Sequence, residues 1–167
     1  MQPTGELGAL IVQRQAVRAI LLASAQEILL LKIRSPDTGE GFWIAPGGGL
    51  QPGESAEQAL KRELHEELGL AVREVDPLVW RRQHTFTWDG RRICQREHYH
   101  VVNVTRFEPH MADLREARTL DRFRWWQVPE LAQASERLTP LSLADIVARY
   151  LASGPPREPP AWEILVD

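Results

Sequence analysis

GGLQPGESAEQALKRELHEELGL, residues 48–70, is the stretch of this sequence that decides the fold. Ser55 is a good helix N-cap, leucines then recur at four-residue spacing, and Gly69 is typical of a C-terminal cap. The pattern predicts an amphipathic helix over residues 56–68. The glycines at 47–49 permit unusual backbone angles and close approach, so we expect another group to pass near that backbone.

Glutamates recur in this segment, at Glu54, Glu57, Glu63, Glu66 and Glu67. On a helix that turns about 100° per residue, Glu66 and Glu67 lie on either side of Glu63, so three carboxylates share one stripe. Like charges at this spacing destabilise a helix by roughly 0.2–0.5 kcal/mol per pair, and a counter-charge is therefore expected. The divalent cations Mg²⁺ and Mn²⁺ suit such oxygen ligands. Three glutamates considered alone would be typical of a solvated acidic helix face.

The spacing of the whole segment resembles the Nudix box, GX5EX7REUXEEXGU, in which U is an aliphatic residue. Gly48, Glu54 and the run from Arg62 to Leu70 match it at every specified position. The chain is thus identified as similar to the Nudix hydrolase superfamily. The resemblance implies an α+β fold, the Nudix α/β/α sandwich with a mixed central sheet. We expect one such domain over residues 1–154, followed by a proline-rich C-terminal tail over residues 155–167.

The resemblance also implies roles for the residues of the box. The metal-ligating glutamates of the family match Glu63, Glu66 and Glu67, and the carbonyl of Gly47 resembles a backbone ligand beside them. Arg62 and Glu54 match positions that brace the loop and the helix, because a guanidinium at this point can hold Glu54 bidentately. The catalytic residues expected within the box are Glu67, Glu63, Arg62 and Glu54. The expected cofactor is Mg²⁺ or Mn²⁺.

Hydrolysis of a phosphoanhydride bond is the activity that the resemblance implies. The substrate would be a nucleoside diphosphate linked to another moiety: a nucleotide sugar, ADP-ribose, a dinucleoside polyphosphate or a nucleoside triphosphate. Markers of the ADP-ribose, diadenosine polyphosphate and NADH hydrolases do not match, so the substrate stays open within this range. The alternative is a catalytically weak Nudix domain that senses a nucleotide and regulates a partner. Such a sensing domain would be expected to lack some of the box carboxylates, whereas all of them are present here.

The base that accepts a proton from the attacking water is expected either in the box or on a loop downstream. Residues 108–120 form a predicted loop, and Glu116 is the residue there that we expect to be catalytic, because such a loop can close over bound substrate. Glu97 is the second choice. The other competitors are Glu108, Asp113 and Asp121.

Two strand-like segments, residues 79–88 and 91–104, are joined by Asp89-Gly90, the signal for a two-residue type I′ turn. This turn sets the register and places Arg82 opposite Glu97 and His84 opposite Gln95. Further strands are predicted at residues 16–24, 27–33, 42–45 and 123–128, and a closing helix at residues 140–151.

Substrate-binding residues are expected on one face of this hairpin: Arg82, His84, Phe86 and Glu97. An arginine or histidine there can contact phosphate, and an aromatic ring can stack on a base. The alternative is structural. Arg82 and Glu97 would then form only a cross-strand ion pair, and His84 would be a hydrogen-bonded core residue.

Composition excludes several classes of protein. The 167 residues suit a single domain, and an apolar content of 43% suffices for one core. A net charge of −3 and a pI near 6.0 give no overall attraction to nucleic acid or anionic lipid. We therefore expect a nucleotide-like small molecule as the partner, with no nucleic acid.

Cellular location and assembly are also expectations. Cys94 is the single cysteine, so no disulfide can form within the chain, and the first residues lack a signal-peptide pattern. No apolar run is long enough to cross a membrane. A cytoplasmic protein without a membrane partner is expected, and the resemblance implies a homodimer, because many family members pair.

Overall fold

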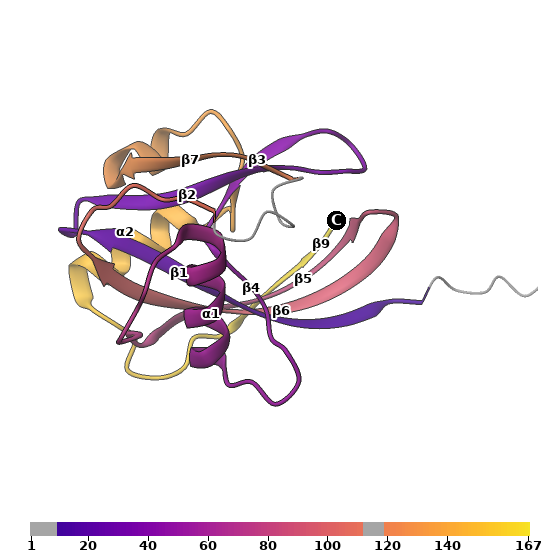
Figure 1. Ribbon diagram of the computed structural model, residues 1–167, viewed down its shortest axis with the longest axis horizontal. Coiled ribbons are helices and arrows are strands. Elements are labelled where there is room, and N and C mark those ends of the chain that lie inside the picture. Colours follow the sequence, from indigo (N-terminus) through magenta and orange to yellow (C-terminus); the bar gives the residue numbers. More distant parts are fainter. Residues whose placement is uncertain (1–9, 112–118) are drawn as a thin grey trace, which may run out of the picture.

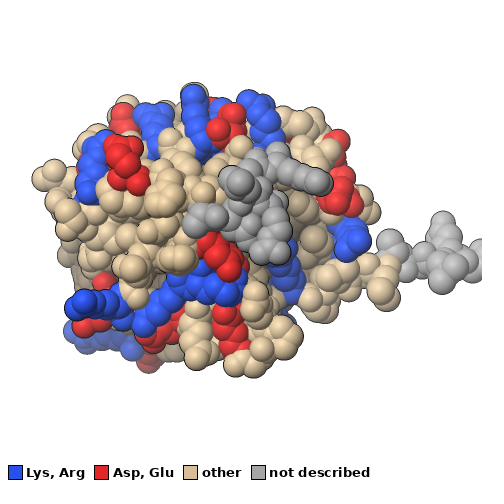
Figure 2. All heavy atoms as spheres, in the orientation of Figure 1, with Lys and Arg blue, Asp and Glu red and all other residues tan. Residues whose placement is uncertain are grey.

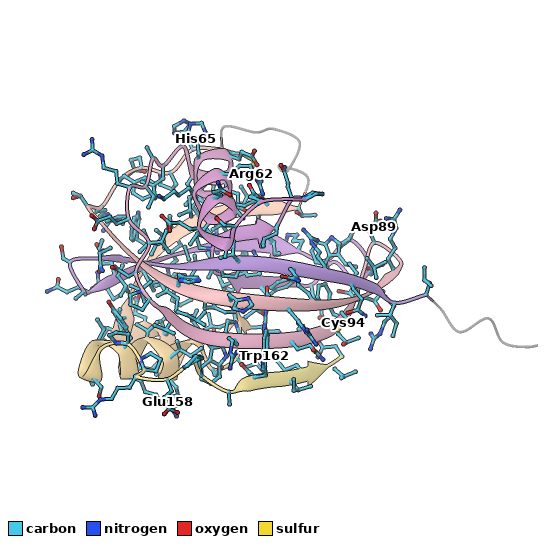
Figure 3. All side chains as sticks on the ribbon, turned by 90° about the horizontal axis from the view of Figure 1, so that it is seen from below. Arg62, His65, Asp89, Cys94, Glu158 and Trp162 are labelled. Atoms are coloured by element: carbon cyan, nitrogen blue, oxygen red, sulfur yellow. The ribbon has the colours of Figure 1, made fainter. Side chains whose placement is uncertain are left out.

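The structure, a computed structural model, describes residues 10–111 and 119–167. Its elements are β1 (Val12–Ala23), β2 (Glu27–Arg34), β3 (Gly41–Ile44), β4 (Gly47–Gly49), α1 (Ala56–Leu68), β5 (Leu78–Trp88), β6 (Arg91–Val104), β7 (Leu120–Gln127), the short helix η2 (Val128–Gln133), β8 (Leu138–Thr139), α2 (Leu143–Ser153) and β9 (Trp162–Val166). One mixed sheet lies between α1 on one side and α2 on the other (Figures 1 and 3). The α/β/α sandwich expected from the sequence is therefore the observed fold.

The sheet has the strand order β8-β3-β2-β1-β6-β5-β9, and in addition β4 pairs with β1 and β7 pairs with β2. Its centre is the long parallel pairing of β1 with β6. The sheet curls so that its two end strands come near each other. Arg137 just before β8 contacts Asp167 just after β9, with 3.3 Å between Nη2 and Oδ2. The box loop, α1 and the β5–β6 hairpin are thereby brought around one hollow.

The predicted hairpin is confirmed. β5 and β6 pair with Arg82 opposite Glu97 and His84 opposite Gln95, the register that Asp89-Gly90 predicts. The closing helix begins at Leu143, later than predicted, after a turn in which the Leu143 N–H donates to the Pro140 carbonyl. The last part of the predicted proline-rich tail is strand β9, which pairs with β5 in parallel.

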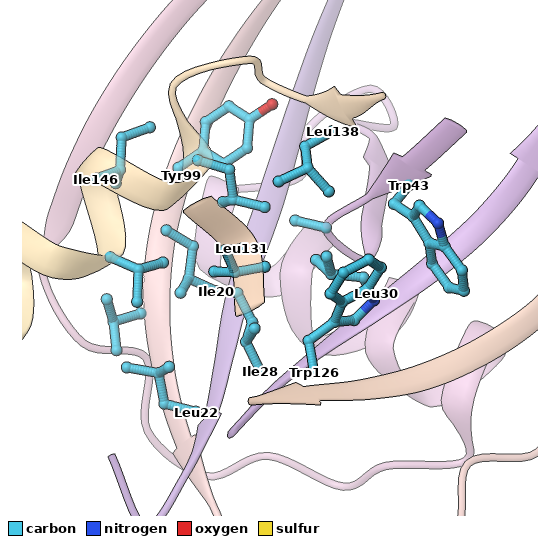
Figure 4. Packing of buried hydrophobic residues seen from close by; sticks show 14 of the residues in the cluster. Ile20, Leu22, Ile28, Leu30, Trp43, Tyr99, Trp126, Leu131, Leu138 and Ile146 are labelled. Carbon is cyan, nitrogen blue, oxygen red and sulfur yellow. The ribbon is translucent and has the colours of Figure 1, made fainter. Parts of the chain in front are cut away.

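Apolar side chains form a core on each face of the sheet. Residues of β1 alternate between the two: Ile20 enters the core under α2, and Leu21 enters the core under α1. The first core also contains Trp43, which is fully buried and packs edge-on against Trp126 at 5.2 Å (Figure 4). The leucines of α1 fill the second core. Burial of this apolar face leaves the acidic stripe of α1 directed toward the glycine loop.

Helix α1 begins and ends where the sequence predicts. The Ser55 side chain accepts the Gln58 N–H, and the Gln58 side chain accepts the Ser55 N–H, which makes a capping box. Gly69 ends the helix with φ at 66°, in the left-handed region. These caps set which residues of the helix meet the loop before it.

Charges on the surface are mixed in sign. Figure 2 shows Lys and Arg side chains next to Asp and Glu side chains over the visible face. Within the part of the chain that the structure describes, no helix is both long and apolar enough to cross a membrane.

Gly47 joins the box loop to the sheet, and we expect it not to tolerate a side chain. Its φ is 140°, and a Cβ there would lie 2.0 Å from the carbonyl oxygen of Val17 in β1. Gly47→Ala should therefore lower the free energy of unfolding by clearly more than the strain of a positive φ, which is about 1–2 kcal/mol. Gly39→Ala is the matched control, because Gly39 has a φ of 75° and nothing within 4 Å of its would-be Cβ. Urea unfolding measures both variants, and equal losses would contradict this account.

Candidate active site

Arg62 is the centre of the acidic box. Its Nε and Nη2 donate to the two carboxylate oxygens of Glu54, at 2.7 and 3.0 Å, so the bidentate contact expected from the sequence is present. Nη2 also donates to the Gly49 carbonyl at 2.9 Å. The hydrogen bond from Arg62 lowers the pKa of Glu54 and keeps it ionised. One guanidinium thus holds the loop against α1.

The three stripe glutamates differ in their surroundings. Glu63 and Glu67 are buried, with 5% and 7% of their surface exposed, and both line the cavity described below. Glu66 is more exposed and lies outside the cavity lining. Arg62 Nη1 donates to Glu63 at 2.7 Å and to Glu66 at 3.2 Å. The Glu67 carboxylate accepts the Gly47 N–H at 3.0 Å.

Glycine brings the loop close to these carboxylates. A Cβ at Gly48 would lie 2.4 Å from Cδ of Glu63, so any larger residue would displace that carboxylate. The carbonyl of Gly47, the expected backbone ligand, accepts a hydrogen bond from Arg18 Nη1 at 3.1 Å. The close approach of another group to this backbone, expected from the sequence, is therefore made by Glu63.

The box residues fit a divalent cation in their donor chemistry. Carboxylate and carbonyl oxygens are the ligands that Mg²⁺ and Mn²⁺ take, and two of the carboxylates are buried side by side with the Gly47–Gly49 backbone. Among residues 10–111 and 119–167, no three His, Cys, Asp or Glu side chains converge closely enough for a metal centre. Arg62 is the counter-charge of Glu63 and Glu66 in this structure.

A buried ion network adjoins the box. Glu97 of β6 is fully buried and accepts from Arg18 Nε at 3.0 Å and from Arg82 Nε at 2.7 Å. Gln95 and the Tyr99 hydroxyl complete its shell at 2.9 and 3.0 Å. Burial alone would raise the pKa of Glu97, but the two guanidiniums outweigh it and lower this pKa to about 2. Since both oxygens are engaged and the group is so acidic, Glu97 is a poor proton acceptor.

One cavity of about 1090 Å³ connects these parts. It is lined by the glycine loop with Glu63 and Glu67, by residues of the β5–β6 hairpin, and by aromatic rings near the hairpin turn. Among these rings, Phe42 and Trp88 meet edge to face at 6.4 Å. The expected substrate-binding residues all line it: Arg82, His84, Phe86 and Glu97. Figure 3 shows Arg62 on α1, above the strands, and Asp89 at the turn of the β5–β6 hairpin, at the right end of the sheet.

Some residues of the cavity were not expected from the sequence, and the expected base, Glu116, lies outside the described residues. Arg18 of β1 and Asp167 after β9 line the cavity beside their partners Glu97 and His84. Each partner is about eighty residues away in the chain, and no local pattern marks such a contact. Glu116 and Asp113 lie outside the described residues, whereas Glu108 and Asp121 are described but do not line the cavity.

Comparison with known proteins gives concordant matches. The sequence model of the NUDIX domain matches residues 12–148. The RNA pyrophosphohydrolase of Yersinia enterocolitica is 31% identical over 145 residues, spanning 74% of this chain and 81% of that protein. The solution structure of the E. coli ORF135 protein superposes with a TM-score of 0.62 at 25% identity, over 89% and 96% of the two chains. A MutT structure described for Aliivibrio salmonicida and Vibrio cholerae gives a TM-score of 0.58 at 28% identity, over 84% and 98%.

The acidity of Glu97 predicts an acid-dependent stability. Its pKa is about 2 in the folded protein against 4.5 in an open chain, so between these values the unfolded state binds one more proton. The stabilisation is present above pH 4.5 and is lost as the pH falls toward 2. Glu97→Gln should lower the free energy of unfolding near pH 6, because it leaves the buried guanidinium of Arg82 and the half-buried one of Arg18 without their carboxylate. It should also flatten the decline of stability from pH 5 to pH 2.

Urea unfolding at a series of pH values measures both effects. The control is Glu74→Gln, which removes an exposed carboxylate and should keep the wild-type decline. A Glu97→Gln protein with the stability and the acid decline of the wild type would show that the network is not formed.

Proposed function

The chain belongs to the Nudix family, and on that premise we propose that it is a Mg²⁺-dependent pyrophosphohydrolase acting on a nucleoside diphosphate linked to another moiety. The observation that supports this proposal most is the continuous cavity. Its lining combines carboxylates and glycine backbone, suited to a cation and phosphates, with an arginine and aromatic rings that follow one another along β5. A nucleotide bound with a cation carries the matching chemical groups.

We assign different roles to the residues at the box and to those on the hairpin. Glu63, Glu66 and Glu67 would hold the cation together with the Gly47 carbonyl, and Arg62 with Glu54 keeps the loop and helix in place. When bound, Mg²⁺ would neutralise phosphate oxygens, polarise phosphorus and acidify a water molecule. Arg82 is fixed by Glu97 and lines the cavity, where it can bind a phosphate oxygen.

The substrate within this class is proposed only as a range. Nucleotide sugars, ADP-ribose, dinucleoside polyphosphates and nucleoside triphosphates all combine phosphates with a nucleoside. Relatives at about 30% identity are named RNA pyrophosphohydrolases, so an RNA with a 5′-triphosphate belongs in the same panel. Release of phosphate, pyrophosphate or nucleoside monophosphate, measured with Mg²⁺ and with EDTA, ranks these compounds. Tight binding of one of them without turnover would instead favour the nucleotide-sensing alternative.

Activity should depend on Glu67. Glu67→Gln removes one ligand charge from the stripe, so kcat on the best substrate should fall roughly 100-fold or more. The fold should persist, because a glutamine oxygen can still accept the Gly47 N–H and because like-charge repulsion decreases. Glu57→Gln, on the same helix but paired with Lys61 at the surface, is the control and should keep its activity. The proposal fails if Glu67→Gln turns over at nearly the wild-type rate.

The general base is proposed to be Glu116. The engaged oxygens and lowered pKa of Glu97 disfavour it as the base, so the other candidates are Asp113 and the box glutamates. Glu116→Gln should lower kcat strongly at saturating metal and substrate while the metal affinity stays within about twofold. The control is Glu108→Gln, which changes a carboxylate outside the cavity lining. An unchanged kcat would contradict the proposal and move the search for the base to Glu97, Asp113 or a box glutamate.

A further inference from the structure

His84 is held in one orientation by a carboxylate. Its Nε2 lies 2.6 Å from Oδ2 of Asp167. An ionised carboxylate only accepts hydrogen bonds, so Nε2 carries the proton in this contact. Burial lowers the pKa of His84 more than Asp167 raises it, and the neutral ring therefore prevails near pH 7. In this tautomer Nδ1 has a lone pair.

That lone pair is available to a ligand. Within the described ranges, no side chain or backbone group donates a hydrogen bond to Nδ1 of His84. The ring lines the cavity and packs against Phe86, with 4.8 Å between centroids. A neutral Nδ1 accepts N–H or O–H and repels phosphate oxygens. Its ligand is therefore a hydrogen-bond donor.

The position of His84 along the cavity indicates which part of a nucleotide it would meet. Arg82 is tied through Glu97 to Arg18, which binds the Gly47 carbonyl at the box. His84 follows Arg82 on the same face of β5, roughly 6–7 Å farther toward the hairpin turn. Phosphates held at the box and Arg82 would place the sugar or base beside His84.

We propose that His84, oriented by Asp167, is a specificity-determining residue that accepts a hydrogen bond from the nucleoside part of the substrate. The proposal rests on the proposed function. The donor is either an exocyclic amino group of the base or a hydroxyl of the ribose. Asp167 is a positioning residue: it keeps the proton on Nε2, and Arg137 Nη2 donates to the same Oδ2 of Asp167 at 3.3 Å.

A purely structural role for this contact is the competing explanation. Strand β9 is already joined to β5 by a ladder from Arg81–Trp162 to Thr85–Val166, and the Asp167 N–H donates to the Thr85 carbonyl at 2.9 Å. The side-chain contact is therefore not needed to seat β9. Its specific effect is on the proton position of His84.

Binding of nucleoside monophosphates tests the proposal without requiring turnover. The probes are AMP and GMP, their analogue IMP, which lacks the amino group, and the 2′-deoxy and 3′-deoxy forms of AMP. Wild type should bind one donor-bearing probe about 5- to 10-fold more tightly than the analogue without that donor. Weaker binding of IMP would identify the amino group of the base as the donor, and weaker binding of a deoxy form of AMP would identify a ribose hydroxyl. Asp167→Ala should bring this ratio close to 1, and Asp167→Asn should restore most of it, because an amide oxygen still accepts the Nε2 proton.

A spectroscopic readout separates positioning from stability. The ¹⁵N chemical shifts of His84 should report one tautomer protonated at Nε2 in wild type and a mixture of tautomers in Asp167→Ala. Glu158→Gln, an exposed residue in the segment before β9, should match wild type in both measurements.

Three results would overturn the inference: a wild-type His84 protonated at Nδ1, an unchanged affinity ratio in Asp167→Ala, or no binding of any probe. Turnover in the substrate panel tests the proposed function separately. If the enzyme hydrolyses a substrate but Asp167→Ala leaves the affinity ratio unchanged, the proposed function stands and the role of His84 is wrong.

Discussion

The contact between Arg62 and Glu54 is the interaction on which the site depends. It fastens the loop before α1 to the helix itself, while the same guanidinium compensates two of the stripe carboxylates. Without it, like charges on one helix face would repel each other beside a glycine-rich loop that has little stiffness of its own. Cation binding would replace this compensation. Arg62 therefore stabilises the acidic stripe by pairing with Glu63 and Glu66, and these carboxylates could exchange that pairing for a bound cation.

A second charge cluster joins the box to the β5–β6 hairpin that lines the cavity. Arg18 lies between the Gly47 carbonyl and Glu97, and Glu97 in turn fixes Arg82. These residues come from β1, the box loop, β6 and β5, so the cluster sets how the box sits relative to the hairpin. A buried carboxylate between two guanidiniums costs desolvation energy, and its full hydrogen-bond shell offsets that cost. Arg82 is thereby held in a fixed position in the cavity lining, next to the box.

Local patterns allowed the box helix and the hairpin register to be predicted from the sequence. Capping residues and a two-residue turn act on their immediate neighbours, so Ser55, Gly69 and Asp89-Gly90 suffice for these elements. Contacts between distant strands carry no such signal. The pairing of β1 with β6 brings Arg18 to Glu97, and strand β9, read as a tail, brings Asp167 to His84. The contacts that follow from local patterns could be predicted, whereas those made by the pairing of distant strands could not.

The central claim is that a cation and phosphates occupy the box end of the cavity while the nucleoside extends along β5 toward the hairpin. Paramagnetic broadening of amide NMR signals by Mn²⁺, titrated with the non-hydrolysable analogue α,β-methylene-ADP, tests this arrangement directly. The account predicts that signals of residues 47–49 and 63–67 disappear first and that those of Asp89 and Gly90 persist longest among residues around the cavity. Broadening centred on the hairpin turn, or spread evenly over the protein, would contradict it.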